Sequence, residues 1–245
     1  MIEKEMYGNV GEFYDVLSED QWNKRKKIII ETLQTFYDVE GVILDIGAGT
    51  GHGSFAALEA IPNADVIALE PSPTMRTALM SRIMRNPRAR EHITVIPTTL
   101  ETFSFPDSLR AVLILGSIGF IDETTRKNLW NIISQKLAKN GGIIFDVMWL
   151  DKPQTIKNLE AATVKIGNNE YKVLMNGEPI DSTHQKWMAT YQIINNGNIL
   201  HQITKTSIWR TLSLTDIENE AKPFGFSLEQ LTFNMIPTAI MKKSI

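Results

Sequence analysis

A glycine-rich turn near residue 48 has the residue types and spacing of a ligand-binding loop. The segment Asp45–Gly51 reads DIGAGTG, and the β-branched run Val42–Ile46 that leads into it predicts a buried strand. Glycine allows a tight turn and a close approach of the backbone to a ligand. A helix beginning near Thr50 would add free N–H groups and a partial positive charge. The turn is therefore a candidate binding site.

Glu70 is a second residue suited to the same ligand. It comes directly after the apolar run Val66–Leu69 and follows Gly47 by 23 residues. Ligands of open α/β sheets bind at the carboxyl ends of the strands. A carboxylate at that place can accept hydrogen bonds from both hydroxyls of a ribose. The glycine-rich turn and Glu70 together indicate a nucleoside-containing cofactor.

The spacing of the glycines separates two classes of cofactor. The dinucleotide fingerprint G-x-G-x-x-G requires a third glycine at position 52, where this chain has His52. Asp45, just before the glycines, suits a cofactor with a cationic amino-acid tail and disfavours an anionic pyrophosphate. An NAD-dependent oxidoreductase is therefore the alternative and not the first choice.

The elements around these residues alternate between strands and helices, which predicts βαβ units and a mostly parallel sheet. The predicted fold class is α/β, a Rossmann-like open sheet with helices on both faces. A capping box at Ser18–Gln21 predicts that a helix begins at Ser18. We expect core strands at residues 42–46, 65–70, 92–96, 111–115 and 143–147, helices at 52–60, from 73, 122–139 and 213–222, and closing strands at 226–233 and 238–241.

The pattern changes after Asp151, where Asn- and Gly-containing turns at residues 167–169 and 195–198 predict two β-hairpins. These hairpins read as a subdomain inserted into the α/β body. The expected organisation is a helical N-terminal lid (1–37), a cofactor-binding core (38–150), an inserted substrate region (151–211) and a C-terminal helix with closing strands (212–245).

These motifs, taken together, resemble those of the class I S-adenosylmethionine-dependent methyltransferases. The resemblance covers residues 38–150 and, more weakly, 212–245. In that family an acidic strand end and glycine loop receive the methionine part of the cofactor, and an acid on the next strand binds the ribose. The cofactor-binding residues implied by the resemblance are Asp45, Gly47, Ala48, Gly49, Gly51, Glu70, Pro71, Ser72, Met75, Thr99, Leu100, Gly116 and Ser117. Thr99 departs from the family pattern, which often has Asp there.

Aromatic and acidic residues outside the glycine loop are candidates for binding the methyl acceptor. The resemblance places them in the N-terminal segment, at the end of the fifth core strand and in the inserted hairpins. We expect Tyr14 and Asp146 to be candidate catalytic residues, and no metal site. The candidate substrate-binding residues are Tyr7, Phe13, Tyr14, Trp22, Asp146, Trp149, Trp187, Tyr191 and Arg210.

Carboxylates and aromatic rings around a sulfonium suit a cationic or amine acceptor. We therefore expect transfer of a methyl group to an amine of a small molecule or short modified peptide, as in natural-product biosynthesis. A narrower resemblance, over Tyr7 to Trp22, is to bacterial peptide N-methyltransferases of the plantazolicin type. The alternatives are a small-molecule O-methyltransferase and, from another class, a non-catalytic cofactor-binding protein.

Composition narrows the remaining functions. The 245-residue chain has no cysteine, so disulfides, thiol nucleophiles and Cys-based metal sites are excluded. Its net charge of -3 disfavours non-specific nucleic-acid binding. The N-terminus lacks a signal-peptide pattern, and no apolar run reaches the roughly 20 residues of a membrane helix. We expect a cytoplasmic monomer or homodimer that binds neither nucleic acid nor membrane.

Overall fold

The computed structural model describes residues 7–232 and 236–244. The chain forms two compact units, each built from segments that are distant in the sequence. The α/β unit comprises Arg25–Trp149 and the residues from Leu212 onward, and the hairpin unit comprises the residues up to Lys24 together with Leu150–Thr211. The helix α1 (Tyr14–Gln34) contributes residues to both. The four-part division expected from the sequence stays a prediction.

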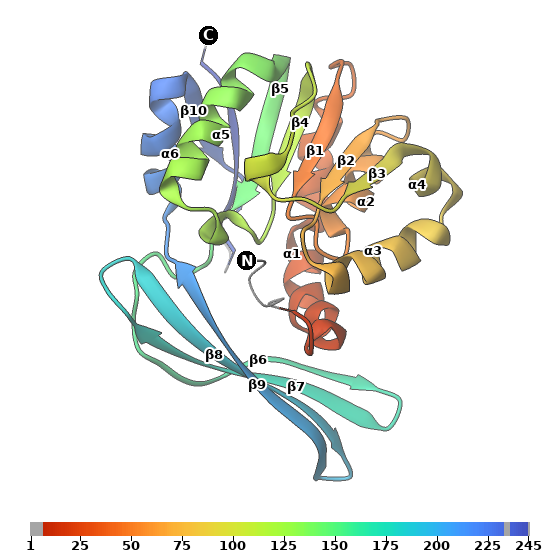
Figure 1. Cartoon of the computed structure of the whole chain (residues 1–245), viewed down its shortest axis with the longest axis vertical. Coiled ribbons are helices and arrows are strands. Elements are labelled where there is room, and N and C mark those ends of the chain that lie inside the picture. Colours follow the sequence, from red (N-terminus) through yellow and green to blue (C-terminus); the bar gives the residue numbers. More distant parts are fainter. Residues whose placement is uncertain (1–6, 233–235, 245) are drawn as a thin grey trace. The chain divides into compact units, whose positions relative to one another are not determined.

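In the described part of the α/β unit, seven strands form one sheet in the order β10-β11-β5-β4-β1-β2-β3 (Figure 1). Five neighbouring strands, from β5 to β3 in this order, are parallel, and β10 and β11 add an antiparallel edge on the other side. Their bounds are β1 Val42–Ile46, β2 Val66–Leu69, β3 Ile93–Ile96, β4 Leu109–Ile114, β5 Leu137–Asp146, β10 Phe226–Gln230 and β11 Thr238–Lys243. The expected mostly parallel sheet is confirmed.

Helices connect the strands and cover the sheet. They are α2 (His52–Ala60), α3 (Pro73–Met84), α4 (Pro87–His92), α5 (Glu123–Lys136) and α6 (Leu214–Ala221), with short 3-10 turns η2 (Leu100–Thr102), η3 (Ile118–Phe120) and η4 (Lys222–Phe224). In α3 the expected apolar stripe of Met75, Leu79 and Ile83 is buried. The Ser72 side chain accepts a hydrogen bond from the Met75 N–H at 3.2 Å, and Pro73 follows at the first helical position, as predicted.

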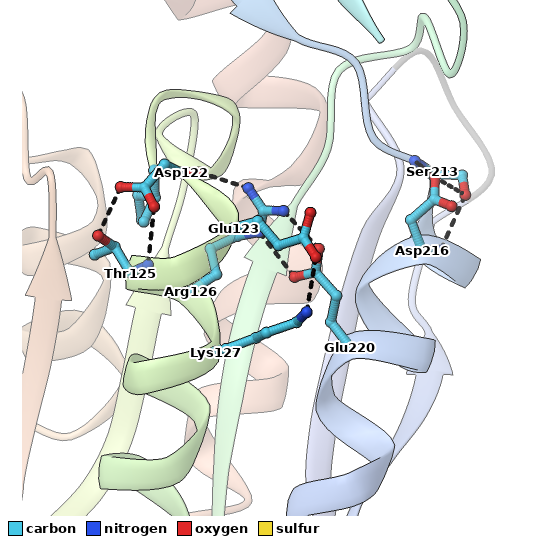
Figure 2. A network of polar contacts seen from close by, with 9 residues as sticks. Asp122, Glu123, Thr125, Arg126, Lys127, Ser213, Asp216 and Glu220 are labelled. Atoms are coloured by element: carbon cyan, nitrogen blue, oxygen red, sulfur yellow. Dashed lines mark hydrogen bonds and ion pairs between the residues drawn. The ribbon is translucent and has the colours of Figure 1, made fainter. Parts of the chain in front are cut away.

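A buried ion pair holds the C-terminal helix against α5 (Figure 2). Arg126 is fully buried and donates from Nε to Glu220 Oε2 at 2.8 Å, and its Nη2 pairs with Glu220 Oε1. The helix α6 begins with a capping box between Ser213 and Asp216. These contacts fix the segment that continues into β10 and β11. Strand β11 then pairs with β5, where Thr238 lies opposite Asp146.

In the described residues of the hairpin unit, four antiparallel strands form a second sheet in the order β6-β7-β8-β9 (Figure 1). Their bounds are β6 Ile156–Ile166, β7 Asn169–Pro179, β8 His184–Asn195 and β9 Asn198–Arg210. Asn196 and Gly197, between β8 and β9, both have positive φ, the conformation that a two-residue hairpin turn requires. The strands extend further than the sequence pattern indicated.

Several element boundaries differ from the expectation, most of all those of α1 and of β5. Helix α1 begins at Tyr14 and not at Ser18, because the 3-10 turn η1 (Gly11–Phe13) continues directly into it through a helical Tyr14. Helix α5 ends at Lys136, where Leu137 pairs with Leu109 and β5 begins. The expected strand end at Phe233 lies outside the described residues.

Candidate cofactor site

The glycine loop after β1 has a backbone that side chains would not tolerate. Gly47, Gly49 and Gly51 all have positive φ, of 71°, 57° and 100°. A Cβ on Gly47 would lie 2.8 Å from the Ser117 Cβ. The N–H groups of Gly47 and Ala48 both donate to the Leu69 carbonyl at 2.9 Å, which ties the loop to the end of β2. Helix α2 then begins at His52, so the predicted strand–loop–helix arrangement is confirmed.

Glu70 lies beside this loop and braces it. Its Oε2 accepts a hydrogen bond from the Gly49 N–H at 2.7 Å, and its Oε1 accepts one from the Ser72 N–H at 2.8 Å. Burial raises the pKa of Glu70, although these N–H groups favour its charged form. A carboxylate has about four lone-pair sites, so roughly two are left for ribose hydroxyls. The residues present therefore suit a ribose at this position.

Arg76 fixes the backbone around Glu70. Its Nη1 donates to the Glu70 carbonyl at 2.8 Å and to the Pro71 carbonyl at 2.7 Å. No motif in the sequence points to Arg76. Its only signal was a long cationic side chain in the first turns of the helix after the acidic strand end, which occurs on many solvated helices.

Asp45 is almost fully enclosed at the end of β1. Its Oδ2 accepts a hydrogen bond from the Ser54 Oγ at 2.7 Å, and its side chain is 2% exposed. Burial raises its pKa to about 6, against the opposing effect of the Ser54 hydrogen bonds. A Cβ on Gly53 would lie 2.9 Å from the Asp45 Oδ2, so α2 packs tightly on the carboxylate. A nearby ammonium group would favour the charged form of Asp45.

The loop after β4 joins the same site. Ser117 Oγ donates to the Ile46 carbonyl at 2.9 Å, and Gly116, with φ of 69°, donates its N–H to Asp146 Oδ1 at 2.7 Å. Asp146 is buried at the end of β5 and forms an ion pair with Arg25 of α1. Burial raises the pKa of Asp146, while Arg25 lowers it.

The structure therefore connects most of the predicted cofactor residues through hydrogen bonds at the carboxyl ends of β1, β2 and β4. Thr99 follows β3 as the N-cap of η2, and Leu100 is the first residue of η2. Thr99 is exposed and Leu100 is half-buried. Their contact with a cofactor stays a prediction, as does the role of each other residue in the site.

The hairpin unit contains an aromatic cluster. Phe13 is fully buried, with its ring 5.7 Å from Tyr171 and 5.2 Å from Tyr191 between centroids. Tyr7 and Tyr14 pack edge to face at 5.5 Å. Tyr171 is not among the residues predicted from the sequence. Strand alternation could have found it, because Tyr171 pairs with Ile193 and so lies on the same face as Tyr191, two residues away on β8.

The other candidate acceptor residues lie in different surroundings. Trp22 and Trp187 are buried in the hairpin unit, where Arg210 is half-buried. Trp149 belongs to the α/β unit and is 38% exposed. Among residues 7–232 and 236–244, no cluster of three or more His, Asp or Glu side chains could hold a metal ion. No helix within those residues is long and apolar enough to cross a membrane.

Comparisons with known proteins agree with this geometry. Residues 43–141 match the family model described as a methyltransferase domain. No curated protein is significantly similar to the chain in sequence. Several solved structures resemble it over nearly its whole length. One is DesVI from Streptomyces venezuelae, with 12% identity, a TM-score of 0.75, and coverage of 97% of this chain and 98% of that one.

Two further structures carry more descriptive names. CalS10 from Micromonospora echinaspora, an amino pentose methyltransferase involved in calicheamicin biosynthesis, was solved with S-adenosylmethionine bound. It shares 13% identity over 98% of this chain and 99% of that one, with a TM-score of 0.75. The sugar N-methyltransferase KedS8 from Streptoalloteichus sp. shares 15% identity over 100% and 97%, with a TM-score of 0.72.

The fold and the matched domain are those of class I methyltransferases. Residues 43–141 are thus a methyltransferase domain, and the chain as a whole has the fold of S-adenosylmethionine-dependent methyltransferases. The matched domain favours a methyltransferase over the NAD-dependent oxidoreductase that the sequence had left open.

Proposed function

We propose that this enzyme methylates an amine nitrogen of a small molecule, with amino sugars as the first acceptors to test. The observation that carries the proposal is the extent of the structural likeness. CalS10 and KedS8 match the hairpin unit as well as the α/β unit, since each covers nearly all of this chain. The likeness thus includes the part of the chain where we place acceptor recognition.

The cofactor, when bound, supplies an electrophilic methyl group on a sulfonium. In the proposed arrangement Glu70 accepts hydrogen bonds from the ribose hydroxyls, and Asp45 lies toward the cationic amino-acid end. The N–H groups of the glycine loop and of the start of α2 complete the proposed cofactor-binding site. Most of the rate enhancement in such a transfer can come from proximity and orientation, so no nucleophilic side chain is needed.

The acceptor contacts are proposed for the aromatic side chains of the hairpin unit. Tyr7, Tyr14, Tyr171 and Tyr191 offer π faces and hydroxyl groups, which attract a protonated amine and can orient a polar sugar. The amine must lose a proton before it attacks, and the Tyr14 hydroxyl is the candidate for relaying that proton by passing on its own. A short modified peptide remains the second acceptor class within the same proposal, and Trp149 and Arg210 are further candidate contacts.

Mass spectrometry on matched acceptors tests this proposal. The purified protein is incubated with S-adenosylmethionine and a panel of amino sugars, the corresponding hydroxy sugars, and short peptides with a free N-terminus. We expect methylated product from an amino sugar and none from its hydroxy counterpart. Methylation of the hydroxy sugars alone would favour the O-methyltransferase alternative, and methylation of peptides alone would replace the acceptor class.

A further inference from the structure

Asp146 has both carboxylate oxygens committed to protein partners. Oδ1 accepts the Gly116 N–H at 2.7 Å, and Oδ2 pairs with Nη1 of Arg25. Asp146 is 2% exposed and Arg25 is 9% exposed, so water screens neither charge effectively. One carboxylate therefore joins three elements that are far apart in the sequence, namely α1, β5 and the loop after β4.

This arrangement is costly as a device for stability alone. A buried ion pair often contributes no more than well-packed apolar residues of similar volume would. The Arg25 Nε also has no hydrogen-bond partner among the described residues, which adds a desolvation cost. Because this polar network contributes little to the stability of the fold, a role in function explains its geometry better.

The network leads to the glycine loop by contiguous contacts. Gly116, held by Asp146, is followed by Ser117, whose Oγ donates to the Ile46 carbonyl. The Ser117 side chain also occupies the space that a Cβ on Gly47 would need. A shift of the Gly116 backbone would therefore displace the group that packs against the loop after β1.

The position of the pair in the chain adds a second reason. Arg25 is the first residue of the α/β unit in α1, and Asp146 lies three residues before Trp149, where the chain leaves that unit. The ion pair thus links two segments of the α/β unit, each next to a place where the chain continues into the hairpin unit. It fixes these segments to the same loop of the cofactor site.

We infer that Asp146 and Arg25 are positioning residues, which hold the Gly116–Ser117 loop, and through it Gly47, in the conformation that receives the cofactor. Neither residue exchanges a proton with the acceptor. This inference rests on the proposed placement of the cofactor at the glycine loop. It replaces the catalytic role that the sequence had suggested for Asp146.

Cofactor binding measured by calorimetry tests the inference without any acceptor. The variants are Arg25→Met, Arg25→Lys, Asp146→Ala and Asp146→Asn. Lys26→Met is the matched control, because Lys26 is the next residue of α1 and pairs with Glu59 on the exposed surface. Thermal unfolding followed by circular dichroism establishes that each variant folds, and only the folded fraction is titrated with S-adenosylmethionine.

We expect Arg25→Met and Asp146→Ala to raise the dissociation constant about tenfold, the effect of losing a charge-assisted contact that orders the site. Lys26→Met should stay within about twofold of the wild type. Arg25→Lys should recover part of the affinity, because it keeps the charge but lacks the planar fork. If Arg25→Met does not fold, the dissociation constants of Arg25→Lys and Lys26→Met are compared instead. An Arg25→Lys value that is no higher than that of Lys26→Met would overturn the inference.

The pH profile of turnover separates positioning from proton transfer. Asp146→Asn keeps an acceptor for the Gly116 N–H but loses the charge that pairs with Arg25. We therefore expect weaker cofactor binding and an unchanged pH dependence of kcat. Loss of one limb of that profile with unchanged cofactor affinity would overturn the inference and restore Asp146 as a base. Wild-type cofactor affinity in folded Arg25→Met and Asp146→Ala would also overturn it. Calorimetry needs no acceptor, so its outcome does not depend on the N-methylation proposal. A failure of that proposal would show only in the mass spectrometry of the acceptor panel.

Discussion

The carboxylate of Glu70 accepts a hydrogen bond from the Gly49 N–H at 2.7 Å, which joins the end of the second strand to the centre of the glycine loop. The same carboxylate also accepts the Ser72 N–H at the start of α3. One side chain thus fixes the conformation of the loop and keeps lone pairs for a ligand. This dual use makes Glu70 the most informative residue for mutation.

Replacing Glu70 with Ala should weaken S-adenosylmethionine binding by about 1–3 kcal/mol, because charged hydrogen bonds to the ribose and to Gly49 are lost. Glu70→Gln should lose less, since its amide oxygen can still accept one of these bonds. Isothermal titration calorimetry measures both. Glu59→Ala, on the exposed side of α2, is the control, and an unchanged dissociation constant in Glu70→Ala would rule out the ribose assignment.

Gly47→Ala should abolish detectable cofactor binding while the protein still folds. The new Cβ would lie 2.8 Å from Ser117 Cβ in a backbone with φ of 71°, so the loop must move. Gly225→Ala is a matched control in the same unit, because Gly225 has φ of 81° and open space around its Cβ position. Comparable losses of affinity in both variants would mean that general backbone strain, and not the loop, causes the effect.

Asp45→Asn should stabilise the cofactor-free protein at neutral pH while weakening cofactor binding. The pKa of Asp45 is raised from 3.8 to about 6 in the folded state, so the folded protein disfavours the charged form. Folding stability therefore falls as pH rises from 3.8 through about 6. Two pKa units correspond to about 3 kcal/mol at neutral pH.

Urea denaturation of the wild type and Asp45→Asn at about pH 4 and about pH 8 measures this difference. We expect the advantage of the Asn variant to be present at the higher pH and to shrink at the lower one. Equal differences in unfolding free energy at both pH values would contradict the raised pKa.

Tyr14→Phe should lower kcat/KM for the acceptor and leave the S-adenosylmethionine dissociation constant unchanged. The variant keeps the edge-to-face packing with Tyr7 and removes only the hydroxyl group. Steady-state kinetics with the acceptor found by mass spectrometry checks this. Tyr37→Phe is the control, because Tyr37 is 59% exposed in the α/β unit. Parallel losses of melting temperature and turnover would assign Tyr14 to packing.

The parts of the site that lie within one strand–loop–helix segment were predictable from the sequence. The glycines at 47, 49 and 51 need left-handed backbone, and Glu70 follows at the end of the next strand, so local chemistry and chain order suffice. The burial of the apolar face of α3 followed in the same way from its helical spacing.

The remaining features of the site and the fold depend on contacts between residues that are distant in the sequence. Arg25 and Asp146 are 121 positions apart, and the Arg25 side chain belongs to a run of four cations that reads as a solvated helix face. The beginning of α1 was mispredicted because a capping box at Ser18 does not exclude a helix that already started at η1. Strand alternation places Tyr171 on the same face as Tyr191, but its packing against Phe13 joins segments that are distant in sequence.

The central claim is that the cofactor lies at the carboxyl ends of β1 and β2, and a crystal structure with S-adenosylhomocysteine tests it most directly. The account predicts ribose hydroxyls within hydrogen-bonding distance of both Glu70 oxygens, with the amino-acid end beside the loop at Gly47 and Gly116. Density for the ligand elsewhere, with the Glu70 carboxylate still bonded only to Gly49 and Ser72, would contradict it.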